Sequence, residues 1–393
     1  MKTFKTTEMK KMVLSFVAIA TLLMSCSDDD DPQVSNTFDV DPSNFMGIIP
    51  EGDHITLDAN TTYYLTGELR IDNGAKLTIP AGTQIEATTP TTASPNVRYI
   101  AVAQGGQIYV NGTADEPVVM TATNKTSSAW GGLVVCGYAP TNKGGSAGAS
   151  ASAEVSGLTY GGDKTKDNSG VLKYLRIEYS GYKYSDTKEF NGLSLFGVGN
   201  STSIEYVSSY KGGDDGIEFF GGTVNARYLV SIDSEDDGID FADGWNGDGE
   251  FWYILNSSKS GVEGSNNGDN GAADYPMTVA TLKNMTIIGM GEKPWYLKEG
   301  AGKQTIDNVV IGGLAAQKGH AYFYTDNKEK DQPANDRITS GDIKITNVAF
   351  VDMGTGNTVK TTEGLSLTEK TDAKGAGNGK DAPVWAAHWS IGD

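Results

Sequence analysis

The chain is poor in cysteine, histidine and basic residues, and each shortage argues against a class of function. Of its 393 residues, two are cysteine and three are histidine. No zinc-spaced Cys/His set is visible, nor is a glycine-rich phosphate loop or a nucleophilic triad. Lysine and arginine number 31 against 50 acidic residues, which gives a net charge of −19 at pH 7. Any approach to phosphate would be repulsive, which argues against nucleic acid as a partner.

Apolar residues are modest in number, and glycine is abundant. The apolar share is 38 %, the charged share is 21 %, and 50 residues are glycine. This composition argues against disorder, and the chain is long enough to bury a large core. Short alternating stretches separated by glycine turns predict β structure, and no amphipathic helix is apparent after the N-terminal segment.

The first 25 residues have the layout of a secretory signal. Four lysines precede an apolar run from Val13 to Met24, which is too short for a stable membrane span. The run ends in Leu23-Met24-Ser25-Cys26, which resembles the lipobox of bacterial lipoproteins. That resemblance implies lipidation of Cys26 and an outer-membrane location. The alternative is an ordinary signal peptide with a chance cysteine.

An acidic segment follows this cysteine. Asp28 to Asp31 resembles the export tag of surface lipoproteins in Bacteroidetes-type bacteria, which implies exposure at the cell surface. The alternative is a solvated acidic tether without an export role. Residues 26–44 are predicted to be a flexible tether, and residues 45–393 the folded domain. No intramolecular disulfide is expected, because Cys136 lies in an apolar run and Cys26 would be acylated.

A repeat of 22 residues indicates the fold. The segment Gly213-Asp214-Asp215-Gly216-Ile217-Glu218-Phe219 returns as Glu235-Asp236-Asp237-Gly238-Ile239-Asp240-Phe241. Leucine-rich repeats would need helical segments, and propeller blades would need about twice this period. The architecture that fits is an all-β, single-stranded parallel β-helix with loops inserted between coils. Seven related segments carry an aromatic or amide residue at their third position: Tyr174, Tyr206, Tyr228, Tyr253, Asn284, Asn308 and Asn347.

Stacking of the coils predicts where side chains point, since equivalent positions lie about 4.8 Å apart. Ile217 and Ile239 should face inward, and Glu218 and Asp240 outward. The tyrosines and asparagines should form buried internal ladders.

Strands with glycine turns extend the pattern toward the N-terminus, for example over residues 74–85 and 106–113. Together these segments resemble right-handed, pectin-lyase-like β-helix proteins of secreted Bacteroidetes origin. Residues 144–157 and 264–276 are expected to be inserted loops gathered on one flank. Trp385 and Trp389 are expected to cap the last coil, with ligand binding as the alternative.

Carboxylates of the repeat are the most informative cluster. The repeat stacks Asp214 near Asp236, Asp215 near Asp237, and Glu218 near Asp240. Like charges about 5 Å apart repel, and a bound cation such as Ca²⁺ or a shared proton would compensate them. The third interpretation is turn chemistry, in which Asp-Asp-Gly carboxylates accept backbone N–H bonds. The candidate calcium ligands are Asp214, Asp215, Asp236, Asp237 and Asp240.

Complete catalytic machinery is not apparent. Polygalacturonase-like hydrolases carry Gly-His-Gly and Arg-Ile-Lys segments, and neither follows the acidic repeat here. Pectate-lyase-like enzymes combine Ca²⁺ with a basic residue, commonly arginine. Arg227 falls in the repeat, but it fits an alternating charge ladder with Lys173 and Glu205. No catalytic residue is therefore assigned.

Two tryptophans suggest sugar binding. The alignment puts Trp252 in the outward column of Arg227, and Trp245 precedes it in an acidic segment. Exposed aromatic rings stack on sugars while neighbouring polar groups bind hydroxyls. The alternative is that an inserted loop covers both tryptophans. The candidate ligand-binding residues are Trp245, Trp252, Asp243, Asp248 and Glu250.

These features predict a lipid-anchored, surface-exposed β-helix that binds an extracellular glycan or other polymer. Its expected role is accessory to an outer-membrane uptake or adhesion complex. One alternative is a lyase or hydrolase acting on acidic polysaccharide, and the other is a structural or interaction protein. A β-helix alone distinguishes none of these.

Overall fold

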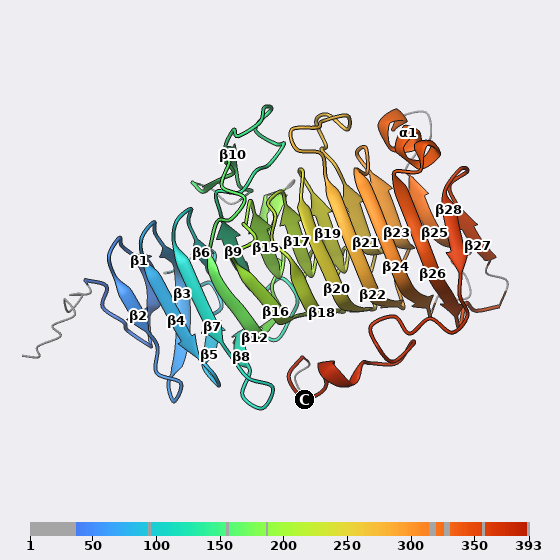
Figure 1. The fold of residues 1–393 in the computed structure, drawn as a ribbon. Coiled ribbons are helices and arrows are strands. Elements are labelled where there is room, and N and C mark those ends of the chain that lie inside the picture. Colours follow the sequence, from blue (N-terminus) through green and yellow to red (C-terminus); the bar gives the residue numbers. More distant parts are fainter. Residues whose placement is uncertain are drawn as a thin grey trace, which may run out of the picture. The chain divides into compact units, whose positions relative to one another are not determined.

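Short parallel strands, each paired with the equivalent strand one coil away, are the main secondary structure of the described residues (Figure 1). The computed structural model describes residues 37–390 except 93, 95, 155–156, 186–187, 314–319, 326–330 and 356–357. Within these residues the main sheet has 24 strands and winds as a right-handed parallel β-helix. The predicted all-β, parallel β-helix fold is confirmed.

The strands stand in three rows, which form the three sides of the coils. Every strand of row 1 within the described residues pairs in parallel with its neighbours. Row 1 consists of β1 (Phe45–Ile49), the end of β3 (Thr62–Ile71), β6 (Tyr99–Val102), β9 (Leu133–Cys136), β15 (Leu193–Phe196), β17 (Ile217–Phe220), β19 (Ile239–Ala242), β21 (Ser260–Ser265), β23 (Lys293–Lys298), β25 (His320–Thr325) and β27 (Thr358–Thr361).

Rows 2 and 3 are separate strands in the first coils and become joined later. Row 2 contains β2 (His54–Thr56), β4 (Lys76–Pro80), β7 (Gln107–Asn111) and β28 (Ser366–Glu369), and row 3 contains the start of β3, β5 (Gln84–Ala87) and β8 (Val118–Ala122). Bent strands run through both rows: β12 (Gly170–Glu178), β16 (Ser203–Tyr210), β18 (Ala226–Ile232), β20 (Asn246–Leu255), β22 (Val279–Ile288), β24 (Lys303–Gly312) and β26 (Ile343–Val351).

One left-handed residue makes the bend in each of these strands. A positive φ turns the chain sharply, and asparagine tolerates this conformation better than most residues. All seven bends are occupied by aromatic or amide residues with φ between 48° and 58°: Tyr174, Tyr206, Tyr228, Phe251, Asn284, Asn308 and Asn347. Six of these are the predicted ladder positions, and Phe251 replaces Tyr253 as the seventh.

The ladder is real, but it is not internal. Tyr174 stacks on Tyr206 with ring centroids 4.3 Å apart, and Tyr206 on Tyr228 at 4.4 Å. These side chains are half-buried at the corner between rows 2 and 3, so the prediction of buried internal ladders is wrong. A side chain at a left-handed corner cannot follow the inward alternation of the strands on either side.

The C-terminal segment runs back along the middle coils and covers the edges of this ladder (Figure 1). Trp389 meets Tyr174 and Tyr206 edge-on at 5.7 and 5.9 Å, and Trp385 meets Tyr228 at 5.2 Å. The prediction that Trp385 and Trp389 cap the last coil is therefore wrong, because these tryptophans pack on β12, β16 and β18 instead. The short 3₁₀ helix η1 (Val384–Ala386) carries Trp385.

The interior is apolar and follows the predicted alternation. Ile217, Phe219, Ile239 and Phe241 are fully buried in the main core. Glu218, which lies between Ile217 and Phe219, lines an outer groove instead. The period of two residues in the repeat thus places one side of each strand in the core.

Insertions interrupt the coils at a few places. β10 (Ala151–Ser152) pairs with β11 (Thr159–Tyr160), and β13 (Lys183–Ser185) with β14 (Lys188–Glu189). A nine-residue helix, α1 (Gln332–Ser340), was not predicted. Its signals are the N-cap Asp331, whose carboxylate accepts from Ala334 N, and the left-handed Gly341 at its C-terminus. Part of the predicted tether contacts the first coil, since Thr37 N and Phe38 N donate to Asp53.

Candidate functional site

A groove lined by carboxylates lies on the outer side of row 1, across β17, β19, β21 and β23. Its volume is about 570 Å³, and ten of its thirteen lining residues are acidic. We call it the acidic groove, and its lining residues are Glu154, Glu189, Gly213, Asp214, Asp215, Glu218, Glu235, Asp236, Asp237, Asp240, Lys259, Glu263 and Lys298.

Strand register aligns these side chains in a column. Glu218 pairs with Asp240, and Asp240 with Glu263, at equivalent positions of β17, β19 and β21. Because neighbouring strands lie about 4.8 Å apart, three carboxylates follow one another at close range. The predicted stacking of Glu218 on Asp240 is confirmed. Sequence reasoning missed Glu263, although Ser260-Gly261-Val262-Glu263 repeats Asp237-Gly238-Ile239-Asp240 at a shift of 23 residues.

A second set of carboxylates lies in the turns that precede these strands. Asp215 Oδ1 accepts a hydrogen bond from Asp237 N at 2.9 Å, and Asp237 Oδ1 accepts one from Ser260 N at 2.5 Å. The turn-chemistry interpretation thus holds for one oxygen of each carboxylate. It does not account for the other oxygens, nor for the carboxylates of the strand column.

Two lysines provide the positive charge in the groove. Lys259 forms an ion pair with Asp236, and Lys298 forms one with Glu263 at 2.8 Å. The groove lining includes no arginine, and Arg227 lies in row 2, paired with Glu205 at 2.6 Å. The predicted charge ladder is confirmed for that pair.

The remaining carboxylates perturb one another strongly. Burial, and to a smaller extent the neighbouring carboxylate of Asp236, raises the pKa of Asp214 to about 8. Burial also raises the pKa values of Asp215, Glu218 and Asp240 well above their ordinary range, and adjacent carboxylates raise them further. The same holds for the pKa of Asp237. The groove therefore needs protons or cations to balance its charge at neutral pH.

Two atoms in the floor lack partners. Asp240 is only 7 % exposed, yet its Oδ1 has no hydrogen-bond partner. Asp236 Oδ1 is likewise buried and without a partner. Asn191 holds the neighbouring carboxylate in place, because its Nδ2 donates to Glu218 Oε2 at 2.5 Å. Buried acceptors without partners are costly, and they point to a group that completes the site.

Two overlapping sets of carboxylates have the spacing of metal ligands. Asp214, Asp215 and Asp236 form one set, and Asp215, Glu218 and Asp240 the other, with oxygen atoms within 4.8 Å of one another. Four of the five predicted ligands fall in these sets. Asp237 lies in neither set, and Glu218 belongs to the second.

The predicted tryptophan platform is wrong. Trp245 and Trp252 are both completely buried in the core. Their ring centroids lie 4.7 and 6.0 Å from that of Phe219. Their indole N–H groups donate to the backbone carbonyls of Val224 and Ala226. In the strand pairing Leu229 lies opposite Trp252, and Arg227 opposite Glu250, which shifts the alignment by two residues. The tryptophans therefore fill the interior.

The other predicted ligand residues are separated from one another. Asp248 is exposed and Glu250 half-exposed on row 2, in a second groove of about 490 Å³ with Arg227. Asp243 lies instead in a chamber of about 210 Å³ that adjoins the acidic groove. The two share Glu154, Glu218, Asp240, Glu263 and Lys298. The five residues do not form one site.

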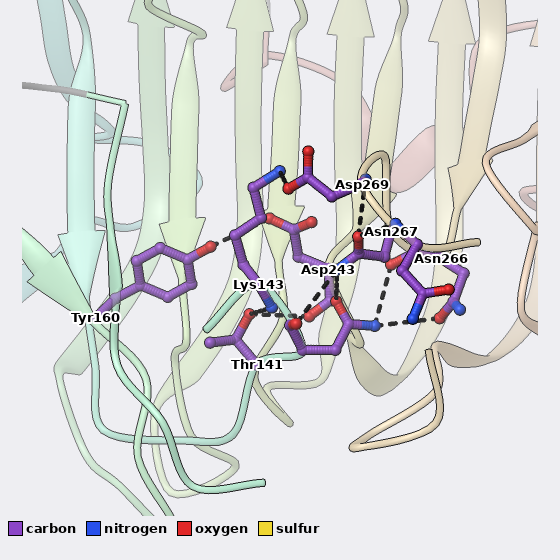
Figure 2. A network of polar contacts seen from close by, with 9 residues as sticks. Thr141, Lys143, Tyr160, Asp243, Asn266, Asn267 and Asp269 are labelled. Carbon is purple, nitrogen blue, oxygen red and sulfur yellow. Dashed lines mark hydrogen bonds and ion pairs between the residues drawn. The ribbon is translucent and has the colours of Figure 1, made fainter. Parts of the chain in front are cut away.

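Two inserted loops meet above Asp243, and we call this contact the loop clamp. Tyr160 OH donates to Asp243 Oδ2 at 3.1 Å, and Thr141 Oγ1 donates to the Asp243 carbonyl at 2.9 Å (Figure 2). Lys143 forms an ion pair with Asp269 at 2.8 Å. The side-chain amides of Asn142, Asn266 and Asn267 join the same network. The predicted gathering of the loops on one flank is confirmed.

The predicted lipidation site, Cys26, and the acidic run Asp28–Asp31 lie outside the described residues. Over the described part of the chain, no helix has the length and apolar character needed to cross a membrane. Cys136 is buried and forms no disulfide.

Known proteins resemble this chain to different degrees. Two solved structures are similar at 10 % sequence identity: the Dettilon tailspike protein (TM-score 0.30) and tailspike protein 2 of Escherichia coli O157:H7 bacteriophage CAB120 (TM-score 0.31). The matches cover 80 % and 78 % of this chain but 61 % and 38 % of the tailspike chains, so it spans less than two thirds of their length. No curated protein matches in sequence. The model of the pectate-lyase-like β-helix domain family matches residues 47–390. The chain therefore belongs to the family of pectate-lyase-like β-helix domains.

Proposed function

We propose that this chain is a lipid-anchored, surface-exposed β-helix protein that binds an extracellular polysaccharide in the acidic groove. The observation that carries the proposal is the groove itself, which extends over several coils and is lined almost entirely by polar side chains. Sugar hydroxyls are hydrogen-bond donors, and carboxylates accept several such bonds each. A row of carboxylates at the spacing of the coils therefore suits a polymer with repeating hydroxyl groups.

The proposed anchor comes from the N-terminal segment. Lipidation of Cys26 would hold the protein in the outer membrane, and Asp28–Asp31 would direct it to the cell surface. The folded domain would then present its groove to polymers outside the cell. A role beside an outer-membrane uptake or adhesion complex follows from that location.

A polysaccharide hydrolase is the second candidate. Carboxyl groups act in pairs in most glycoside hydrolases, and Asp215, Glu218 and Asp240 have oxygen atoms within 4.8 Å of one another. The sequence has no Gly-His-Gly or Arg-Ile-Lys segment after the acidic repeat. Binding without turnover remains the first proposal for this reason.

The test is a glycan array probed with the full protein, made soluble by Cys26→Ala. Reducing-end and unsaturated-product assays on every bound glycan run in parallel. Glu263→Gln removes a groove carboxylate that belongs to neither metal-ligand set, and Asp248→Asn is the matched control on row 2. We expect the glycan bound by the parent protein to be lost with Glu263→Gln and retained with Asp248→Asn. Equal binding by both variants would refute the groove as the binding site, whereas new reducing ends would favour the hydrolase.

A further inference from the structure

We propose that the chamber beside Asp243 binds one unit of an amino sugar, with the protonated amine held by the carboxylate of Asp240 and the sugar ring stacked on Phe220. The chamber has a volume of about 210 Å³. Pockets for drug-sized ligands measure about 300–1,000 Å³, so this one suits a single small ring rather than a long chain. Three observations carry the inference: a gap in a stack of aromatic rings, a buried acceptor without a partner, and the charge of the walls.

The apolar wall of the chamber is the end of a stack of aromatic rings. Phe196 and Phe220 occupy equivalent positions of β15 and β17, and their rings stack with centroids 4.0 Å apart and planes 8° apart. The next position of this column, on β19, is Ala242, whose methyl group is too small to cover a ring. Phe220 and Ala242 both line the chamber. The chamber therefore lies where a third ring would continue the stack, and a sugar ring can take that place.

Asp240 supplies an independent observation at the same place. It lines the chamber and is only 7 % exposed, yet its Oδ1 has no hydrogen-bond partner. A buried acceptor without a partner is costly, and an ammonium group brings N–H donors together with the opposite charge.

The backbone of β19 places this carboxylate within reach of the stacking position. Asp240 and Ala242 are two residues apart in the strand, so their side chains lie on the same face, about 7 Å from each other along it. A ring stacked above Ala242 can therefore reach Asp240 with one substituent. The geometry suits a small ring that carries one amine.

The charge of the walls favours a cation over an anion. Six carboxylates line the chamber, against the two lysines Lys143 and Lys298. Both lysines are already paired, Lys143 with Asp269 and Lys298 with Glu263, each at 2.8 Å. Negative potential therefore dominates the chamber, and it attracts an ammonium group while it repels carboxylated or sulfated sugars. The face of Phe220 adds a favourable contact, because aromatic faces attract cations.

The chamber is connected with the proposed polymer site. It adjoins the acidic groove, and the two share five lining residues, Asp240 among them. A polymer in the groove can thus place one of its units in the chamber, provided that this unit carries a free amine. This extension from a single amino sugar to a polymer rests on the proposed function, whereas binding of the single sugar does not.

The test measures dissociation constants by ligand-observed NMR for glucosamine, glucose and N-acetylglucosamine, with the full Cys26→Ala protein at about pH 6, where an aliphatic amine is protonated. We expect glucosamine to bind at least about tenfold more tightly than either neutral sugar, because a charge-assisted hydrogen bond is roughly twice as strong as a neutral one. Asp240→Asn should remove this preference. Ala242→Phe should abolish the binding of glucosamine, because the new ring would complete the stack and fill the chamber.

Asp248→Asn, on row 2, is the matched control and should leave the affinity for glucosamine unchanged. Circular dichroism verifies that each variant is folded, and the comparison of the three sugars on the parent protein needs no variant. Absence of glucosamine binding, or equal affinity for the three sugars, would overturn the proposal. So would full binding by Ala242→Phe or an unchanged preference in Asp240→Asn. If glucosamine binds as expected and no glycan on the array does, the chamber site stands and the proposed function fails. If a glycan binds through Glu263 and glucosamine does not bind, the reverse holds.

Discussion

Replacing Asp243 by asparagine should make the protein more resistant to unfolding near neutral pH. Asp243 is buried beneath the loop clamp, and burial raises its pKa from 3.8 to about 6, although Lys143 and Tyr160 favour the charged form. Asparagine keeps an oxygen that can accept from Tyr160, and it tolerates the left-handed φ of 55° at this position. The substitution therefore removes the charge and little else.

The magnitude follows from the pKa. A carboxyl whose pKa is raised in the folded state costs nothing below about pH 3.8, where it is protonated in both states. The cost grows as the pH rises and is complete above about pH 6. At about 1.4 kcal/mol for each pKa unit, the difference between 3.8 and about 6 is about 3 kcal/mol. As the pH rises from 3.5 to 7, the free energy of unfolding of the parent protein should fall by about 3 kcal/mol relative to that of Asp243→Asn.

The assay is urea unfolding of both proteins at a series of pH values, in chelator so that metal binding does not contribute. Asp269→Asn is the matched control, because its effect on the free energy of unfolding should change with pH in the opposite direction. Hydrogen bonding to Lys143 lowers the pKa of Asp269, so its contribution is present at neutral pH and is lost as the pH falls. A stability difference between the parent and Asp243→Asn that does not change with pH would refute the reasoning.

The remaining predictions concern the core, the C-terminal segment and the anchor. Trp252→Ala should lower the free energy of unfolding by about 3–5 kcal/mol, because the indole is fully buried, and an unchanged urea midpoint would contradict this. Trp389→Ala should lower the melting temperature and expose Tyr174 and Tyr206, which is checked by calorimetry and by quenching of tyrosine fluorescence with acrylamide. Cys26→Ala should move the protein from the membrane fraction to the soluble fraction, and persistent membrane association would disprove the lipid anchor.

Much of the fold can be predicted from the sequence because each coil of a β-helix repeats the coil before it, displaced along the helix axis. A residue lies above the residue one repeat earlier, so the shift of 22 places Ile239 on Ile217 and Asp240 on Glu218 without any knowledge of distant contacts. The period of two residues then decides which of them face inward. The same local rule was sufficient to bring most of the acidic groove together.

Register is where local rules stop being sufficient. Phe251, Trp252 and Tyr253 are consecutive aromatic residues, and any of them could continue the column of Tyr228 by residue type alone. In the structure Phe251 occupies this position, and its ring stacks on that of Tyr228 with centroids 5.0 Å apart. Trp252, the next residue, therefore points into the core. The choice depends on the space inside the coil, because an indole fills the interior volume beside Phe219 and a surface position would leave it empty.

Contacts between distant segments were decided by the tertiary structure alone. Tyr160 reaches Asp243 across 83 residues, and Asn142 reaches Asn266 across 124, because insertions on different coils project from the same flank. No spacing in the sequence encodes those distances, since each insertion has its own length and shape. The repeat therefore determined the coils and their acidic columns. The burial that perturbs the carboxylates, and the shared position of Asp215 between two ligand sets, arise only when the coils and loops pack together.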